Sequence, residues 1–287
     1  MGQKFWQIWV VAGILGAIAI TFILLAIMGL DGAKPATSPD PEPVAGEEAE
    51  EAPPEEIYDP LLDGTWSYSP GPEGPVNWGK IRSEFELCQT GTSQSPIDIR
   101  AFELVMERPL VSIGYGDAQL MVRVGSDRFS AVVENEHTFM LDGNTFRLDR
   151  IVIHSPAEHR LDGKQMPMEV QLQHQGAGGT LVLSLLLNAG PENPSLQPLI
   201  EAVGGYPDTP IVSASTNLAT LLPGNLSYYL YKGSLTHPPC YENVSWLVFK
   251  EVGTVSRAQL ASFQSVVKNN VRPIQSKSRD VEFYRLD

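Results

Sequence analysis

The chain has 287 residues, a net charge of −14 and two cysteines. This length allows one large folded domain with a sizeable core. No basic patch interrupts the acidic sequence, so a role in binding nucleic acid has no support.

Residues 5–30 form a long stretch that contains no charged side chain and is almost entirely apolar. A helix over these residues would be about 39 Å long, and the hydrocarbon core of a bilayer is about 30 Å thick. The apolar part of a cleaved secretory signal is shorter, about 7–15 residues. We therefore predict an uncleaved transmembrane helix, with residues 1–30 as the cytoplasmic end and the membrane span. A cleaved signal is the alternative.

Residues 31–63 differ sharply in composition, with eleven acidic residues, seven prolines and a single lysine. Such a segment cannot bury enough apolar surface to fold, and prolines together with like charges keep it extended. We predict a solvated acidic Pro-rich linker. A docking segment for a basic partner is the alternative.

From residue 64 onward, apolar and polar residues alternate in short runs, which indicates β-strands. The run at 181–187 is continuously apolar, as expected of a strand buried on both faces. We predict strands at residues 119–124, 131–133, 146–153, 168–173, 181–187 and 244–249. Helical periodicity is limited to 195–202 and 256–269, with Ser256 as the N-cap of the second helix. The pattern predicts one mainly β domain, residues 64–287, with few peripheral helices.

Five motifs in this region resemble those of the α-carbonic anhydrases and follow that family's order. They are Trp66-Ser-Tyr68, Gln94-Ser-Pro-Ile-Asp-Ile99, the pair of segments at 151–159 and 169–174, Tyr231-Lys-Gly-Ser-Leu-Thr-His-Pro-Pro-Cys240, and Asn270-Val-Arg-Pro-Ile-Gln275. The resemblance implies a single domain around a large twisted, mostly antiparallel β-sheet, with an active site in a conical cleft.

The resemblance places the family's three zinc-binding histidines at Val152, His154 and Gln171. A catalytic zinc site needs three protein ligands and an open position for water, whose pKa the ion lowers to about 7. Val152 has no donor atom, and the amide of Gln171 suits hard cations better than zinc. We therefore expect no metal and no other cofactor, with His154 as a vestigial ligand that is hydrogen-bonded within its strand.

Other positions of the implied active site are partly altered and partly kept. Gln173 stands where the family places an apolar residue of the CO2 pocket. Arg150 stands where the family's glutamine supports the first zinc ligand, and a guanidinium there would repel a cation. Thr236 and Glu158 match the pair that orients zinc hydroxide, and His137 matches the proton-shuttle histidine. We interpret these last three residues as vestigial.

The remaining histidines also fall on positions of the family. We expect His159 and His174 to pack within strands with satisfied hydrogen bonds. For His137 we expect an exposed loop position. His237 follows Thr236 at a position where the family often has threonine.

The two cysteines, Cys88 and Cys240, occupy the positions of a disulfide in secreted and bacterial α-carbonic anhydrases. Two buried free thiols are the alternative. Because disulfides persist in oxidising compartments, we predict a periplasmic or extracellular domain and a cytoplasmic N-terminus.

These observations predict a non-catalytic, membrane-anchored protein that is not an enzyme. It would act as a structural or binding subunit of a membrane complex, such as a respiratory or photosynthetic one, in contact with the other subunits. One alternative is an active carbonic anhydrase with atypical zinc ligands, in which His154 is joined by donors from Gln171 or Glu158. Another is a module that binds a small anion, such as bicarbonate, in the polar cleft.

Overall fold

The computed structural model describes residues 64–107, 109–125, 127–204, 211–275 and 280–286. These residues all belong to one compact unit, residues 56–287. The predicted span at 5–30 and the predicted linker at 31–63 lie outside the described residues, so both stay predictions. Among the helices of the described ranges, none combines the length and the apolar character needed to cross a bilayer.

Strands dominate the described part of the chain. Their bounds are β1 Asp98–Ile99, β2 Glu103–Val105, β3 Val111–Gly114, β4 Asp117–Val124, β5 Phe129–Val133, β6 Thr138–Leu141, β7 Asn144–His154, β8 Arg160–Leu161, β9 Lys164–Gln165, β10 Met168–Gly176, β11 Gly179–Ala189, β12 Val212–Asn217, β13 Tyr228–Ser234, β14 Glu242–Phe249, β15 Gly253–Val255 and β16 Glu282–Tyr284. Each of the six predicted strands lies within an observed strand, and the prediction of a mainly β domain is confirmed.

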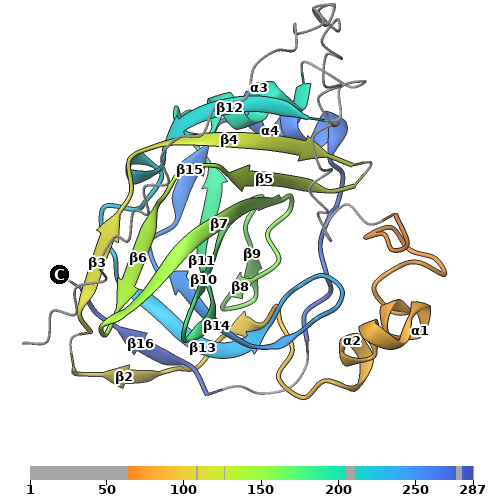
Figure 1. Ribbon diagram of the computed structural model, residues 1–287, viewed down its shortest axis with the longest axis horizontal. Coiled ribbons are helices and arrows are strands. Elements are labelled where there is room, and N and C mark those ends of the chain that lie inside the picture. Colours follow the sequence, from red (N-terminus) through yellow and green to blue (C-terminus); the bar gives the residue numbers. More distant parts are fainter. Residues whose placement is uncertain (1–63, 108, 126, 205–210, 276–279, 287) are drawn as a thin grey trace, which may run out of the picture. The chain divides into compact units, whose positions relative to one another are not determined.

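The larger sheet has thirteen strands, ten of which follow the order β12-β4-β5-β7-β10-β11-β14-β13-β16-β2 (Figure 1). Most neighbouring strands are antiparallel, but β11 pairs in parallel with β14 and β15, and β16 pairs in parallel with β2. Parallel neighbours need a long connection, and the chain between β11 and β14 supplies one. A smaller sheet contains β1, β8 and β9.

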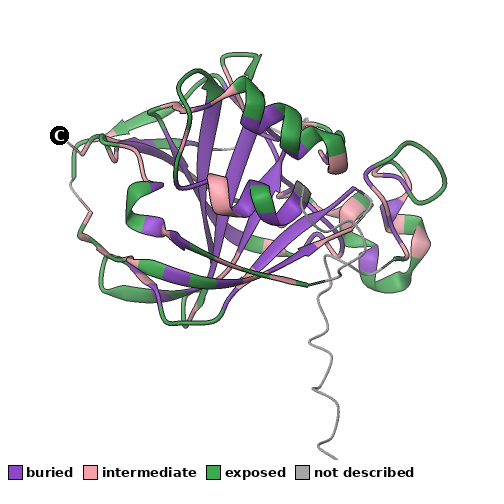
Figure 2. Cartoon of the chain, turned by 90° about the horizontal axis from the view of Figure 1, so that it is seen from above, coloured by how far each residue is buried: buried purple, intermediate pink, exposed green. Residues whose placement is uncertain are grey.

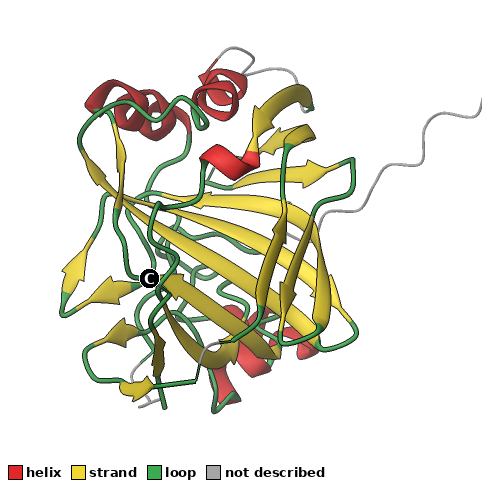
Figure 3. Ribbon diagram, turned by 90° about the vertical axis from the view of Figure 1, so that its left-hand side faces the viewer, coloured by secondary structure: helices red, strands yellow, loops and turns green. Residues whose placement is uncertain are grey.

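The helices are short and lie in two groups (Figure 3). Their bounds are α1 Trp78–Ile81, the 3-10 turn η2 Ser83–Phe85, α2 Leu87–Thr90, α3 Gln197–Gly204, the 3-10 turn η3 Leu218–Thr220 and α4 Arg257–Val266. The predicted N-cap of α4 is confirmed, because the Ser256 side chain accepts from the backbone N–H of Gln259, whose side chain in turn accepts from the backbone N–H of Ser256.

The central strands are buried on both faces (Figure 2). One face of β7, β10, β11 and β14 packs into the main apolar core through residues such as Ile151, Leu172 and Leu247. The opposite face carries a second apolar cluster around Trp246 and Val248, and beside that cluster it carries polar side chains. The candidate site residues described below therefore lie on this second face of the central strands, opposite the main apolar core.

Candidate functional site

Antiparallel pairing of β7 with β10 brings the implied ligand positions together. Val152 lies directly opposite Gln171, and His154 lies opposite Glu169. Since side chains alternate along a strand, these residues share one face, while Ile151 and Ile153 enter the main core on the other. The three residues Val152, His154 and Gln171, called the ligand row below, thus stand next to one another as the resemblance implied.

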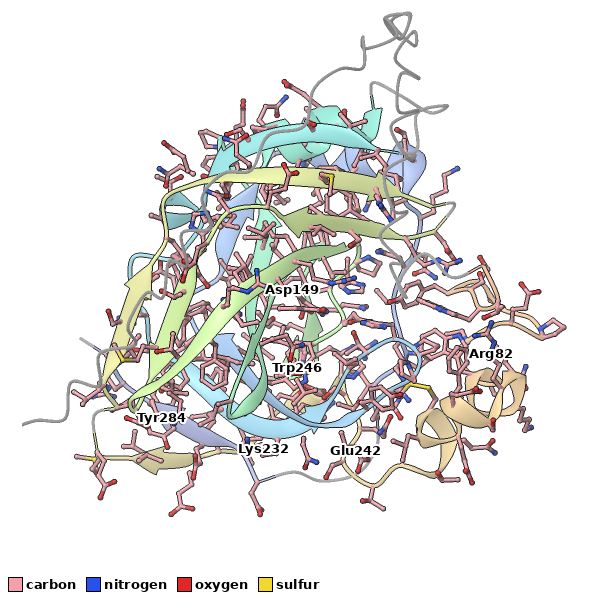
Figure 4. The ribbon with its side chains drawn as sticks, in the orientation of Figure 1. Arg82, Asp149, Lys232, Glu242, Trp246 and Tyr284 are labelled. Carbon is pink, nitrogen blue, oxygen red and sulfur yellow. A yellow bond between two sulfur atoms is a disulfide. The ribbon has the colours of Figure 1, made fainter. Side chains whose placement is uncertain are left out.

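A bulge in β7 shapes one wall of this region. Arg150 pairs with Gln173 and Leu148 pairs with His174, so Asp149 is an extra residue in the strand. The guanidinium Nε of Arg150 donates to Asp149 at 3.2 Å, and Gln173 is buried. Figure 4 labels Asp149 on β7 and Trp246 on β14, among the side chains of the central strands. The predicted altered pocket is polar at these two positions.

His154 is completely buried, and its two ring nitrogens have different surroundings. Nδ1 donates to the backbone carbonyl of Asn270. Nε2 has no hydrogen-bond partner among the described residues, and Glu158 Oε2 lies 3.4 Å from it. The ring also packs edge-on against Tyr68, with the ring centroids 5.9 Å apart. His154 therefore makes the expected hydrogen bond through Nδ1 alone.

Glu158 stands between the ligand row and the C-terminal part of the domain. Its carboxylate accepts from the backbone N–H of Arg272 and from Gln171 Nε2, each at 2.9 Å. Burial raises the pKa of Glu158, and the neighbouring His154 and the hydroxyl of Thr236 oppose this rise. That hydroxyl is close enough to act on the pKa but does not meet hydrogen-bond geometry. Glu158 and Thr236 are therefore near each other, as the resemblance implied.

The amide nitrogen of Gln171 is hydrogen-bonded, whereas its amide oxygen is not. Nε2 donates to Glu158 at 2.9 Å and to Glu169 at 3.1 Å. Oε1 is buried and has no hydrogen-bond partner in the described structure. Two carboxylate acceptors fix the orientation of the amide, so the oxygen faces away from both of them.

The ligand row does not fit the three-histidine zinc centre that the resemblance implies. Val152 belongs to an apolar cluster that includes Trp66, Tyr68 and Trp78, and it offers no donor atom. Within the described ranges, no group of three or more His, Cys, Asp or Glu side chains could hold a metal ion. The donor atoms available here are one imidazole nitrogen, one carboxylate and one amide oxygen.

A hydrogen-bonded network behind the ligand row is fully formed. Glu169 accepts from the backbone N–H groups of Glu158 and His159, from His159 Nδ1, and from the hydroxyl of Ser184, all within 2.8–2.9 Å. Burial alone would raise the pKa of Glu169, but the His159 ring and its hydrogen bonds outweigh burial and lower the pKa to about 2. Glu158, His159, Glu169 and Ser184 are called the supporting network below.

His159 and His174, which lie outside the ligand row, have hydrogen-bond partners at both ring nitrogens. His159 Nε2 also contacts the Tyr231 hydroxyl at 2.6 Å, and His174 lies between Leu181 O and the Tyr115 hydroxyl. Satisfied hydrogen bonds are confirmed for both, although His159 lies in the loop before β8. Burial lowers the pKa of His174 to about 4.

The expectation of an exposed His137 is wrong. Its side chain is buried, because the ring packs edge-on against Tyr115 and Nε2 lies 3.2 Å from the Asn135 side chain. Its backbone carbonyl also accepts from the N–H of Leu148 in β7. The loop is therefore closed onto the sheet.

The Cys88–Cys240 disulfide is present, with an S–S distance of 2.04 Å. It joins the segment at α2 to the loop that carries Thr236 and His237. Next to it, Gln94 Nε2 donates to the Cys240 carbonyl at 3.1 Å and to Glu242 at 3.0 Å. The loop is thus attached covalently to α2, and polar contacts through Gln94 connect it to Glu242 in β14.

Sequence reasoning missed two residues of the site. Asn270 holds the end of β7, because its side chain donates to Ile153 O at 2.7 Å and accepts from the N–H of Ser155 at 2.9 Å. Tyr68 packs against His154, and its backbone N–H donates to Asp127 at 2.6 Å. Both lie in motifs that supported the resemblance, so the signal was present but gave no role.

Comparisons with known proteins agree with this geometry. The family model described as eukaryotic-type carbonic anhydrase matches residues 73–284. The chain is 36% identical over 213 residues to a carbonic anhydrase of Pectobacterium carotovorum, which covers 73% of this chain and 86% of that protein. The solved α-carbonic anhydrase of Thermovibrio ammonificans, in complex with the inhibitor sulfanilamide, matches with a TM-score of 0.69 and 36% identity, over 76% of this chain and 98% of that one. Dioscorin complexed with ascorbate matches with a TM-score of 0.73 and 28% identity, over 77% and 98% of the respective chains.

These similarities contradict two predictions made from the sequence, that the chain is not an enzyme and that it is a structural or binding subunit of a membrane complex. The first prediction rested on Val152 and Gln171, and the second rested in addition on the predicted architecture of one membrane span followed by a large domain. A change at two ligand positions leaves Glu158 and Thr236 in place, and two of the three proteins named above are carbonic anhydrases. The alternative of an active enzyme with atypical ligands agrees better with these relatives.

Proposed function

The chain belongs to the eukaryotic-type carbonic anhydrase family, and we propose that it interconverts carbon dioxide and bicarbonate at the second face of its central strands. The observation that carries the proposal is the retained pair of Glu158 and Thr236, buried beside His154. The proposal concerns the reaction CO2 + H2O ⇌ HCO3− + H+. In the direction of hydration, the water oxygen forms a bond to carbon, the electron pair of one C=O π bond moves to oxygen, and a proton passes from the water to the solvent.

Glu158 and Thr236 have the chemistry to orient the attacking water. Two N–H donors, from Arg272 and Gln171, fix the Glu158 carboxylate. A carboxylate close to the Thr236 hydroxyl attracts its proton, so a lone pair of the hydroxyl oxygen is left to accept from water. Holding water in one orientation next to CO2 removes part of the entropic cost of the reaction. The ligand row does not fit the three-histidine zinc set, so the proposed step does not involve that ion.

Arg150 and Gln173 should make the proposed site bind the anion bicarbonate in preference to the apolar gas CO2. Their register brings them together next to the ligand row. A guanidinium attracts bicarbonate, whereas a buried amide in place of an apolar residue disfavours an apolar gas. We therefore expect tighter binding of bicarbonate than of CO2.

The activity test is oxygen-isotope exchange between labelled bicarbonate and water, catalysed by the full-length chain. We expect exchange above the uncatalysed rate, and a fall in kcat/KM of about a hundredfold in Thr236→Val. Thr254→Val, on β15, is the matched control and should retain the rate of the unmodified chain. No exchange above background by the unmodified, folded chain would remove the proposal.

The proposed location is a membrane surface, with residues 5–30 as a single span, a cytoplasmic N-terminus and the domain periplasmic or extracellular. The uncharged sequence of residues 5–30 and the Cys88–Cys240 disulfide support this arrangement. Protease added to intact cells, or to spheroplasts for a periplasmic domain, should digest the domain. The chain should also stay with the membrane after alkaline carbonate washing. Release by carbonate would contradict the anchor.

A further inference from the structure

We propose that a cavity beside the Cys88–Cys240 disulfide binds a small organic carboxylate through the guanidinium of Arg272. The cavity has a volume of about 200 Å³, and its walls come from the start of α1, from α2 and from residues 272–275. Figure 4 shows the disulfide as a yellow bond next to α2. The proposed function requires no ligand at this place, so the two proposals can fail separately.

The first argument comes from the charge of Arg272, whose side chain is almost completely buried. Nη1 donates to Ser95 O at 2.8 Å and Nη2 donates to Cys88 O at 2.9 Å, and both acceptors are neutral carbonyls. Burial lowers the pKa of Arg272 to about 10, so the guanidinium still carries its positive charge at neutral pH. Arg272 therefore places a buried cation in the wall of the cavity.

The second argument is that no carboxylate is paired with this cation. Glu158 acts on it electrostatically, but accepts from the backbone N–H of Arg272 and not from the guanidinium. Among the described residues, the two carbonyls are the hydrogen-bond acceptors of the guanidinium, which carries five N–H groups in all. A buried charge without a counter-charge is costly. An anion in the cavity would supply both the counter-charge and the missing acceptors.

The walls of the cavity indicate the class of anion. A guanidinium binds a carboxylate through two parallel hydrogen bonds, because the two planar groups match in shape. The remaining walls are mainly apolar at Pro75, Val76 and Pro273, and Gln89 adds an amide. Sites for larger small molecules have volumes of about 300–1,000 Å³, so this cavity suits an acid of only a few carbons. We therefore expect a short monocarboxylate, such as butyrate, with its alkyl part against the prolines.

Arg272 connects the cavity to the candidate site without belonging to the ligand row. Its backbone N–H holds Glu158 at 2.9 Å, whereas its side chain lines the cavity and holds the carbonyl of Cys88. A carboxylate at the guanidinium therefore leaves the contact with Glu158 in place. Since binding need not alter turnover, binding itself is the quantity to measure.

The test is a titration of the full-length chain in detergent with butyrate, followed by ligand-observed NMR, with butyramide as the uncharged ligand of similar shape. We expect saturable binding of butyrate and none of butyramide. Val76 lines the cavity and is 83% exposed, so its substitution leaves the core intact. Val76→Glu should weaken butyrate binding by about threefold, and Val76→Lys should strengthen it by about threefold. Met106→Glu, at an exposed position outside the cavity lining, is the matched control and should bind like the unmodified chain.

A second variant tests the guanidinium itself. Arg272→Lys keeps the charge but loses the planar pair of donors, so butyrate binding should weaken by about tenfold. If Arg272→Lys fails to fold, the opposite shifts expected at Val76 still decide. Absence of saturable butyrate binding by the folded chain, equal binding of butyramide, or an affinity unchanged in both Val76 variants would overturn the site.

Discussion

The ligand row and the supporting network contact each other through Gln171, yet they differ in how completely their polar atoms are satisfied. Glu169 in the supporting network accepts five hydrogen bonds, and both nitrogens of His159 have partners. In the ligand row, His154 Nε2 and Gln171 Oε1 have no hydrogen-bond partner within the described chain, and Val152 is apolar. The difference teaches that residues which hold the site can be kept while the residues that define its chemistry change.

The largest effect is expected when histidine is placed at the two altered positions of the ligand row, because this should remove the difference between the two regions. Val152→His combined with Gln171→His should raise zinc affinity by about a thousandfold or more, which corresponds to about 4 kcal/mol. The reason is that the supporting network already fixes the neighbouring backbone. The dissociation constant for zinc, measured against a competing chelator, checks this expectation. An unchanged constant would mean that the network no longer positions these strands for a metal.

Removing the charge at the centre of the supporting network should cost about as much. Glu169→Gln replaces an acceptor of five hydrogen bonds by an amide that places N–H groups against donors. We expect a loss of about 3–5 kcal/mol in the free energy of unfolding. Chemical denaturation at pH 7 measures it, and a loss below about 1 kcal/mol would show that the network is not essential.

The same substitution changes the dependence of stability on pH. The folded-state pKa of Glu169 is about 2, against an ordinary value of 4.5. A lowered carboxyl pKa contributes stability that is present above pH 4.5 and is lost as pH falls toward 2. The difference in unfolding free energy between the unmodified chain and Glu169→Gln should therefore shrink across this interval. A difference that stays constant would contradict the lowered pKa.

His174 provides a smaller pH effect outside both regions. Its folded-state pKa of about 4 lies below the ordinary 6.5, because the ring is buried. As pH falls below 6.5 the unfolded chain takes up the proton first, so stability is lost between pH 6.5 and pH 4, by about 3 kcal/mol in total. Unfolding free energies of the chain and of His174→Gln over this range test it. A variant with the same pH slope as the unmodified chain would assign the effect to other groups.

The smallest effect is expected at the N-cap of α4, and this variant serves as a stability control. Ser256→Ala removes the N-cap of α4 and should cost about 1 kcal/mol of stability. Because it touches neither the ligand row nor the supporting network, isotope exchange should not change. A change in the exchange rate would indicate that a loss of global stability alone lowers the measured activity.

The sequence was sufficient to predict the elements whose signal is local. Alternation and apolar runs located six strands, and the sequence at Ser256 located the start of α4. The disulfide followed from the resemblance. Strands such as β12 and β13 were not predicted. Periodicity also carries no information on which strands pair, so the parallel neighbours β11 and β14 could not be found that way.

The site shows the same limit at the level of single side chains. Motif positions predicted that Glu158 and Thr236 would be close together. They did not predict that Gln171 would donate to two carboxylates, because that contact depends on the register of β10 against β7. The burial of His137 was missed for a related reason, since the packing partner Tyr115 lies 22 residues earlier, beyond the range of local patterns.

The contacts of Asn270 and Arg272 have a consequence for how the protein is made. These two residues hold His154, Ser155 and Glu158 from more than one hundred positions further along the chain. During synthesis, the strands that carry those residues leave the ribosome long before the segment that fixes them. A nascent chain stalled or cut before Asn270 would contain β7, β10 and β11 but would lack the contacts that orient His154. Such a fragment would contain the central strands of the sheet, but its site would not yet be formed.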